Sequence, residues 1–295
     1  MKRWYTVLFW LMLASPMAIA QEYKLEEIAT GVHRFTAGPY HSVVWATDDG
    51  LAVIDPLSTE AATWLKGELR RRFSQPLRYV IYSHNHYDHS YGGEALDGPG
   101  VTFVSHEMAR LDLVESAART RIPELTFKEQ LTLRLGGQSL RLSYHGPNNG
   151  RGSVSCLFEQ QRLLFVVDWI VVGRMPWKDL QGYDIAGMIA STREVLGWDW
   201  DTFVGGHAEV GDKAAVRRYL SYLEALYEAV RDGMIAGKSL EELQAEIRLD
   251  EFRDLAQYEA WLPLNIGGVY RTLADQSYIL MRPEVKARQG TAVSR

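Results

Sequence analysis

The sequence of 295 residues contains only one cysteine, Cys156. A single thiol cannot form a disulfide within the chain, so no internal disulfide stabilises this fold. Cys156 lies in the alternating run "GSVSCLFEQ", which predicts a buried strand residue. A thiol in the middle of a strand is a poor nucleophile, and the sequence shows no Ser-His-Asp or Cys-His arrangement that would indicate nucleophilic catalysis.

Basic residues are slightly fewer than acidic ones, 32 against 37, and long apolar runs are scarce. The formal net charge is −5, and it becomes −7 without Lys2 and Arg3 near the N-terminus. This mild acidity argues against a nucleic-acid partner or an anionic membrane surface. Beyond the N-terminal segment, no stretch approaches the roughly 20 apolar residues that a transmembrane helix needs, so we expect no membrane span after that segment. The sequence leaves the oligomeric state open.

The N-terminal segment has the three parts of a secretory signal peptide. Lys2 and Arg3 precede an apolar run from Trp4 to Ala14, and the small residues of "AIA" end at Ala20. The apolar run is short for a stable membrane anchor, although an uncleaved anchor stays open. We predict a signal peptide over residues 1–20 and a mature chain that begins at Gln21, in the periplasm or secreted.

Hydrophobic periodicity divides the remaining chain into two parts. From residue 21 to residue 211, strand patterns alternate with helix patterns, and hairpin turns at Asp48-Asp49-Gly50 and Gly136-Gly137 interrupt them. An α/β fold with two mixed β-sheets covered by helices fits this order best. From residue 212 to residue 295 the periodicity is helical. We expect this part to be a helical extension docked on the first.

A cluster of histidine and aspartate follows the predicted strand "LRYVIYS". In "SHNHYDHSYGG" the residues His84, His86, Asp88 and His89 fall within six positions. Imidazole nitrogen and carboxylate oxygen are the common ligands of zinc besides thiolate. The spacing lets two histidines share one side of a loop while the Asp-His pair faces a second position. The cluster therefore predicts part of a metal site whose other ligands lie elsewhere in the chain.

This motif resembles the signature of the metallo-β-lactamase superfamily. The resemblance covers residues 28–210 and implies a four-layer αβ/βα sandwich. It also implies that His84 and His86 belong to one metal position. Asp88, His89 and the strand-end His207 of "FVGGH" belong to a second. Asp168, which ends the strand "LLFVV", stands where the family has an Asp that bridges the two positions, although Val167 replaces the usual preceding glycine.

One element of the family pattern is different. Asn149 in "YHGPNNGRGS" stands where the third histidine of the first position is expected. A neutral carboxamide is a weak zinc ligand compared with imidazole. His145 would substitute for it only if the loop were remodelled, so a role at the strand end or in the pocket wall is the preferred interpretation. We therefore predict one tightly bound Zn²⁺, held by Asp88, His89 and His207, and a second position that is empty or weakly filled.

Other polar residues near these motifs are candidates for the pocket. His41 begins a strand whose start faces the pocket in the resembling family, and Tyr87 lies between two ligands of the cluster. Either one lines the cleft or has a purely structural role. Arg119 and Arg121, in "AARTRIPE", would attract an acidic substrate, but a solvated pair is the more common explanation.

The combined pattern predicts an exported, zinc-dependent hydrolase that acts on a small molecule. A zinc ion would generate hydroxide near neutral pH, which would attack the carbonyl of an ester, lactone, thioester or β-lactam. Asp88 and Asp168 would hold the water and shuttle its proton. Two alternatives remain: a mono-iron dioxygenase that uses His84, His86 and Asp168, and a metal- or ligand-binding protein on a catalytically decayed site.

Overall fold

The computed structural model of this protein describes residues 22–292. The predicted signal peptide lies outside the described residues, so cleavage before Gln21 stays a prediction. Within residues 22–292, no helix combines the length and the apolar character needed to cross a bilayer.

The first β-sheet is mixed and joins strands in the order of the sequence. Its first four strands pair antiparallel, and β4 to β7 pair parallel. From edge to edge they are β1 (Tyr23–Ala29), β2 (Val32–Ala37), β3 (Tyr40–Thr47), β4 (Gly50–Ile54), β5 (Leu77–Ile81), β6 (Thr102–His106) and β7 (Leu125–Phe127). The sequence patterns did not predict the two edge strands, because β1 is largely exposed and β7 is very short.

The second β-sheet is also mixed, with one parallel pair at its edge. Its order is β12 (Thr202–Gly205), β11 (Leu163–Val166), β10 (Val154–Phe158), β9 (Gln138–Tyr144) and β8 (Gln130–Leu135), and only β11 and β12 run parallel. The predicted turn between β8 and β9 is present. Gly136 and Gly137 both have positive φ angles, 56° and 71°, a conformation that a two-residue hairpin requires and that glycine adopts without strain.

The two sheets pack face to face, and helices cover their outer faces, so the predicted four-layer α/β sandwich is confirmed. Successive strand residues point to opposite faces: Trp45 packs between the sheets with Cys156 and Phe165, whereas its neighbour Val44 packs outward against Leu65 of α1. Cys156 is fully buried in the core between the sheets, as predicted.

Helices cover the outer faces of both sheets, and polar side chains cap the starts of two of them, α1 and α5. The first sheet is covered by α1 (Thr59–Arg72), α3 (Gly93–Leu96) and α4 (Glu107–Glu115), and the second by α5 (Ile185–Leu196) and α6 (Lys213–Ile235). Ser58 accepts a hydrogen bond from the Ala61 N–H at the start of α1, and Asp184 accepts one from Gly187 at the start of α5.

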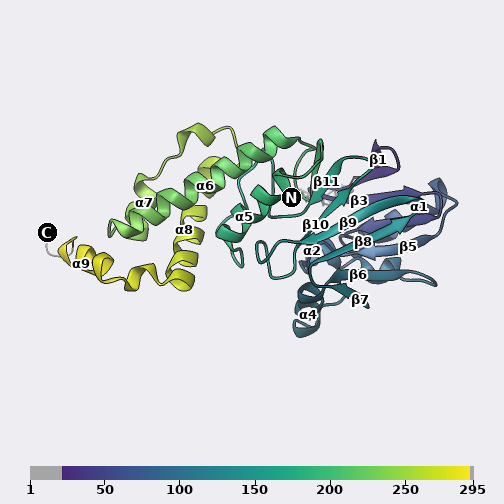
Figure 1. The fold of residues 1–295 in the computed structure, drawn as a ribbon, viewed down its shortest axis with the longest axis horizontal. Coiled ribbons are helices and arrows are strands. Elements are labelled where there is room, and N and C mark those ends of the chain that lie inside the picture. Colours follow the sequence, from purple (N-terminus) through teal and green to yellow (C-terminus); the bar gives the residue numbers. More distant parts are fainter. Residues whose placement is uncertain (1–21, 293–295) are drawn as a thin grey trace, which may run out of the picture.

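The C-terminal part is helical and extends away from the strands, as Figure 1 shows. It continues from α6 through α7 (Leu240–Glu246), η1 (Asp250–Phe252), α8 (Tyr258–Ser277) and η2 (Ile279–Met281) to α9 (Pro283–Ala292). The helix α8 runs through Pro263 without a break. Residues of α6, α7 and α8 share one apolar core with α5 and the outer face of the second sheet, so this part is docked on the sandwich.

Candidate metal centre

The histidine cluster follows the carboxyl end of β5, on the side of the first sheet where its parallel strands all end. His84 lies in the loop after this strand, and His86 caps the short helix α2 (Tyr87–Ser90). Asp88 and His89 follow within α2 itself. The turn from loop to helix separates the cluster into two pairs that face different partners, as the spacing predicted.

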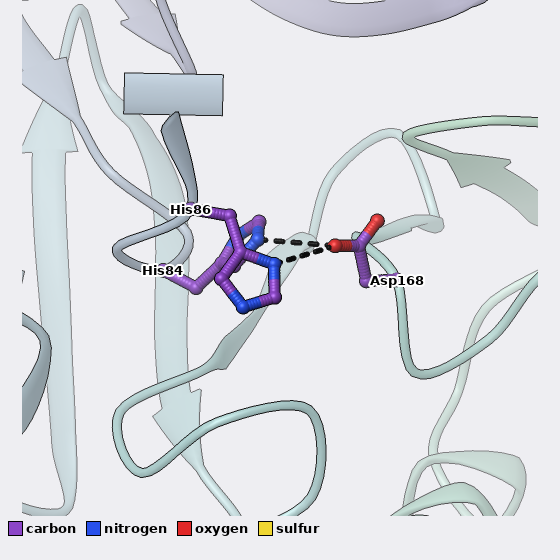
Figure 2. Close-up of side chains that lie close together, drawn as sticks. All are labelled: His84, His86 and Asp168. Atoms are coloured by element: carbon purple, nitrogen blue, oxygen red, sulfur yellow. Dashed lines mark hydrogen bonds and ion pairs between the residues drawn. The ribbon is translucent and has the colours of Figure 1, made fainter. Parts of the chain in front are cut away.

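The first ligand group consists of His84, His86 and Asp168. Nε2 of His84 lies 3.2 Å, and Nδ1 of His86 lies 3.1 Å, from the same carboxylate oxygen, Oδ2 of Asp168. Figure 2 shows both rings directed at this oxygen. Asp168 follows β11 and has a φ angle of 67°, a left-handed conformation that aspartate tolerates better than most residues. Asp168, at the end of a strand in the second sheet, thus supplies a carboxylate to two histidines that follow a strand of the first sheet.

The second ligand group consists of Asp88, His89 and His207. The Nε2 atoms of His89 and His207 are 3.0 Å apart, and Oδ2 of Asp88 lies 3.7 Å from the former and 3.6 Å from the latter. His207 comes after β12 and Gly206. A Cβ atom at Gly206 would lie 3.0 Å from Cε1 of His89, so glycine at this position lets the two histidines approach.

Asp168 connects the two groups. Its Oδ2 faces His84 and His86, and its Oδ1 lies 2.8 Å from Nε2 of His207 and 3.8 Å from Nε2 of His89. Burial by itself raises the pKa of Asp168, but interactions with the neighbouring imidazoles of His207, His84 and His86 outweigh it and hold this pKa well below its usual range. The bridging carboxylate is therefore ionised at neutral pH.

The two groups fit divalent metal ions. Ligand atoms about 2.0–2.2 Å from a tetrahedral zinc ion lie about 3.3–3.6 Å from one another, close to the separations observed in both groups. In each group the three ligand atoms lie within 4.8 Å of one another. Nε2 of His84 and Oδ1 of Asp168 are buried without a hydrogen bond of good geometry, which leaves their lone pairs available for a metal. All the donors are imidazole or carboxylate, which suits zinc, iron or manganese.

Asp55 contacts residues of both ligand groups on the side away from the metal positions, and no pattern in the sequence indicated this role. It accepts hydrogen bonds from the Ser83 backbone N–H at 2.7 Å and from the Ser83 hydroxyl at 2.6 Å. Because that hydroxyl donates to Asp55, it accepts from Nδ1–H of His84 at 2.9 Å and leaves Nε2 of His84 free for a metal. Oδ2 of Asp55 also lies 3.5 Å from Nδ1 of His89. Asp55 thus fixes the orientation of one histidine in each group.

The carboxylates make this centre attractive to cations. Burial lowers the pKa of His89, but Asp55, Asp168 and Asp88 outweigh it and raise this pKa to about 9. A buried imidazole that retains a proton above neutral pH indicates a strongly negative surrounding. A divalent cation bound here would neutralise the same carboxylates. His89 would then lose its proton, because imidazole coordinates metals in its neutral form.

His145 and Asn149 do not join either ligand group. Nε2 of His145 lies 2.8 Å from the Ser155 hydroxyl and Nδ1 lies 2.9 Å from Glu194, so both ring nitrogens are engaged away from the centre. The remodelled loop in which His145 replaces the missing histidine is therefore not observed. Asn149 is fully buried, and neither its amide nitrogen nor its amide oxygen has a hydrogen-bond partner among the described residues.

A cleft of about 350 Å³ opens beside Asp88 and is lined by Tyr40, Tyr87 and Tyr91. Tyr87, a predicted pocket residue, is 67% exposed at this cleft. Tyr40 was not predicted, yet its ring lies edge-on to His207, with the ring centroids 5.4 Å apart. Its position at the start of β3 gave no indication of this role in the sequence, because the pairing of strands brings Tyr40 to the centre.

His41 is buried behind this cleft. Its Nε2 lies 2.7 Å from the Arg34 guanidinium and its Nδ1 lies 3.2 Å from the Thr36 hydroxyl, while its backbone N–H donates to Gly206. Burial first, and then the charge of Arg34, lowers the pKa of His41 to about 3. The neutral ring therefore supports the loop that carries His207, and His41 is not among the residues that line the cleft.

A family model and a curated relative match much of this chain. The model of the metallo-beta-lactamase superfamily matches residues 36–250. The 2,4-dinitroanisole O-demethylase subunit alpha of Nocardioides sp. (strain JS1661) is 25% identical over 237 residues, which cover 79% of this chain and 69% of that protein.

Solved structures show the same fold. A metallo-beta-lactamase from Pontibacter korlensis superposes with a TM-score of 0.62 at 22% identity, over 69% of this chain and 99% of that one. The DIM-1 metallo-beta-lactamase superposes with a TM-score of 0.61 at 18% identity, over 69% of this chain and 97% of that one. About three tenths of this chain thus has no counterpart in either structure.

Proposed function

This chain belongs to the metallo-β-lactamase superfamily, and on that premise we propose that it is a zinc-dependent hydrolase of small molecules. The observation that carries the proposal is the pair of ligand groups that share Asp168. Zinc bound there would act as a Lewis acid and lower the pKa of a water molecule toward about 7. Residues of the chain would then place and deprotonate that water.

The carboxylates have separate tasks in this reaction. Asp168 faces both ligand groups, so it would hold a water molecule between them. Asp88 is partly exposed at the cleft, so it can accept the proton of that water while the water oxygen attacks a substrate carbonyl. The same proton would pass to the leaving group when the carbon–oxygen, carbon–sulfur or carbon–nitrogen bond breaks. Asp55 takes no part in the proton transfer, because Ser83 and His89 surround it.

The cleft beside Asp88 supports a substrate of modest size with a flat or aromatic part. Its volume of about 350 Å³ accommodates one substituted ring, and three tyrosine rings line it. Esters, lactones, thioesters and β-lactams all present a carbonyl that would reach Asp88 from this cleft.

A second candidate is O-demethylation of an aromatic methyl ether. The relative named as an O-demethylase subunit aligns over most of this chain, and the tyrosine-lined cleft suits an aromatic ring. In this case the substrate would be an aryl methyl ether, and water would displace its methoxy group to give a phenol and methanol.

Metal analysis combined with turnover tests these proposals. Purified protein is analysed for zinc, iron and manganese by mass spectrometry, then assayed with an aryl ester, a lactone, a thioester, a β-lactam and 2,4-dinitroanisole, with and without oxygen. Zinc with oxygen-independent turnover is expected. Iron together with strict oxygen dependence would point instead to a dioxygenase on His84, His86 and Asp168. Metal without any turnover would favour a binding protein on a decayed site.

Export is part of the proposal. The N-terminal "MKRWYTVLFWLMLASPMAIA" supports cleavage after Ala20 and release into the periplasm or the medium. Intact-mass measurement of the protein from the periplasmic fraction should give a chain that begins at Gln21. A membrane-bound chain that retains Met1 would contradict this.

A further inference from the structure

His207 differs from His84 and His89 in what holds its imidazole ring. Nδ1 of His84 is hydrogen-bonded to the Ser83 hydroxyl, and Nδ1 of His89 lies 3.5 Å from Asp55. Nδ1 of His207 has no such partner among the described residues. A metal-binding imidazole is normally oriented by a hydrogen bond to its second nitrogen. The position of His207 therefore depends on the backbone that carries it.

The backbone on both sides of His207 is held by the first sheet. On one side, the His41 N–H donates to the Gly206 carbonyl at 2.8 Å. On the other side, Nη2 of Arg34 donates to the Ala208 carbonyl at 3.0 Å. Arg34 lies on β2 and His41 on β3, whereas the two carbonyls follow β12 at the edge of the second sheet. These two hydrogen bonds therefore join the sheets at a ligand of the second group.

Further hydrogen bonds keep the Arg34 guanidinium in this position. Nη2 of Arg34 lies 2.7 Å from Nε2 of His41, and Nδ1 of His41 lies 3.2 Å from the Thr36 hydroxyl. Because the ring of His41 is neutral, Nε2 accepts from Arg34 and Nδ1–H donates to Thr36. Both hydrogens of Nη2 are thus engaged, one by Ala208 and one by His41. The Arg34 side chain is only 11% exposed, so it is held rather than solvated.

Electrostatic attraction does not account for Arg34 at this place. Its positive charge opposes the binding of a metal cation one residue along the chain from the Ala208 carbonyl. The carboxylate that it contacts, Glu209, lies 3.4 Å away on a side chain that is 90% exposed. An ion pair this exposed contributes little to folding. The hydrogen bonds to Ala208 and His41 are therefore the stronger reason for an arginine here.

We propose that Arg34 is a positioning residue for the second metal position. Together, Nη2 of Arg34 and the His41 N–H form a clamp on the backbone around His207, which keeps Nε2 of His207 beside Asp88 and His89 before any metal binds. A ligand that is already ordered costs less conformational entropy when the ion binds. The inference rests on the metal-dependent function proposed above, but it concerns the placement of a ligand and not the reaction.

Zinc affinity tests the clamp without turnover. It is measured on the full-length mature protein by competition with a chromophoric zinc chelator. Arg34→Met should raise the zinc Kd about 10–100-fold, as is typical when a residue that orients a metal ligand is lost. The direction is informative, because removal of a nearby positive charge alone would lower the Kd. An unchanged or lower Kd in Arg34→Met would overturn the proposal.

Arg72→Met is the matched control. Arg72 also donates to a backbone carbonyl, that of Leu25 at 2.8 Å, and also pairs with a carboxylate, that of Glu68. It lies at the end of α1 in the outer layer, so its replacement should leave the zinc Kd unchanged. Equal increases of the Kd in Arg72→Met and Arg34→Met would reflect a general loss of stability and would overturn the clamp.

Two further readouts separate positioning from a structural role. Arg34→Lys keeps the charge and one donor for the Ala208 carbonyl, so it should recover part of the zinc affinity that Arg34→Met loses; no recovery would contradict the role of that hydrogen bond. At saturating cobalt, Arg34→Met should also change the visible absorption bands, because the imidazole of His207 is displaced. Bands identical to those of the parent would count against the clamp.

Hydrogen exchange tests the clamp even if Arg34→Met does not fold. In the metal-free parent, the His41 N–H should exchange as slowly as the paired amides of β3, because the Gly206 carbonyl accepts from it. Fast exchange at His41 alone would overturn the clamp. Where Arg34→Met folds, exchange at His41 should be about tenfold faster or more. A parent protein that binds no zinc would refute the proposed metal-dependent hydrolase, and the exchange measurement would then decide the clamp by itself.

Discussion

Replacement of His207 by alanine asks whether the second ligand group holds the tight metal ion. Nε2 of His207 lies 3.0 Å from Nε2 of His89, 3.6 Å from Oδ2 of Asp88 and 2.8 Å from Oδ1 of Asp168. His207→Ala therefore removes a ligand atom that lies close to both other members of the second group and to Asp168. The side chain of His207 is 13% exposed at the edge of the centre, so water can replace it and the cost to folding should be small.

The second group should bind metal more tightly than the first because it has more negative charge. Asp88 belongs to it alone, and Asp168 also directs one oxygen toward it. The first group has only the other oxygen of Asp168 and two imidazoles, and Asn149, at the position of the missing histidine, does not join it. A carboxylate attracts a divalent cation more strongly than an amide does, so we expect about one tightly bound zinc ion per chain.

The size of the effect follows from the number of ligands. Four ligands supply about 10–16 kcal/mol in structural zinc sites, or about 2.5–4 kcal/mol each. Loss of one ligand should therefore raise the zinc Kd about 70-fold to 900-fold. His84→Ala, in the first group, should leave the tight ion in place and change its Kd less than tenfold. Asn149→His should raise the metal content toward two ions per chain, because it restores an imidazole.

The assay is metal content after dialysis against a weak chelator, followed by competition with a chromophoric zinc chelator. The matched control is His33→Gln, since His33 is a buried histidine that packs edge-on against Phe73, away from both ligand groups. It should keep the parent's zinc content. Two tightly bound ions in the parent protein, or a tight ion that survives His207→Ala and leaves with His84→Ala, would refute the assignment to the second group.

Three further changes test the surroundings of the centre. Asp55→Asn should weaken zinc binding about 10–100-fold, because it removes the charge that orients Ser83 and His89; an unchanged Kd in the zinc competition assay would contradict this role. His41 has its pKa lowered to about 3, so the unfolded chain takes up the proton first and stability falls as the pH drops from about 6.5 toward 3. In metal-free protein, His41→Gln should reduce the slope of unfolding free energy against pH in that window, by the equivalent of up to one bound proton. Urea titrations at several pH values that give the same slope for the variant and the parent would refute this. Cys156→Ser should lower the free energy of unfolding by about 1–3 kcal/mol, since it places a hydroxyl in an apolar core, and zinc content should not change.

Local spacing and strand ends were enough to predict much of this protein. The positions of His84, His86, Asp88 and His89 within six residues indicated a metal centre before any contact was known. Alternation of strand and helix patterns predicted two mixed β-sheets covered by helices, and active-site residues of such folds gather where the parallel strands end. Membership of the metallo-β-lactamase superfamily, suggested by that motif, is confirmed by the family model. These features are encoded in neighbouring residues, so the sequence displays them.

Only the tertiary structure decided which distant residues support the centre. Asp55 lies at the end of one strand and Ser83 at the end of the next, and their hydrogen bonds exist because β4 and β5 pair parallel. Arg34 lies on β2, and it reaches the Ala208 carbonyl because the two sheets pack against each other. His145 was separated from the ligands in the same way, since folding turns its ring toward Glu194. Such contacts depend on how strands and helices pack across long stretches of chain, and no local pattern in the sequence records that packing.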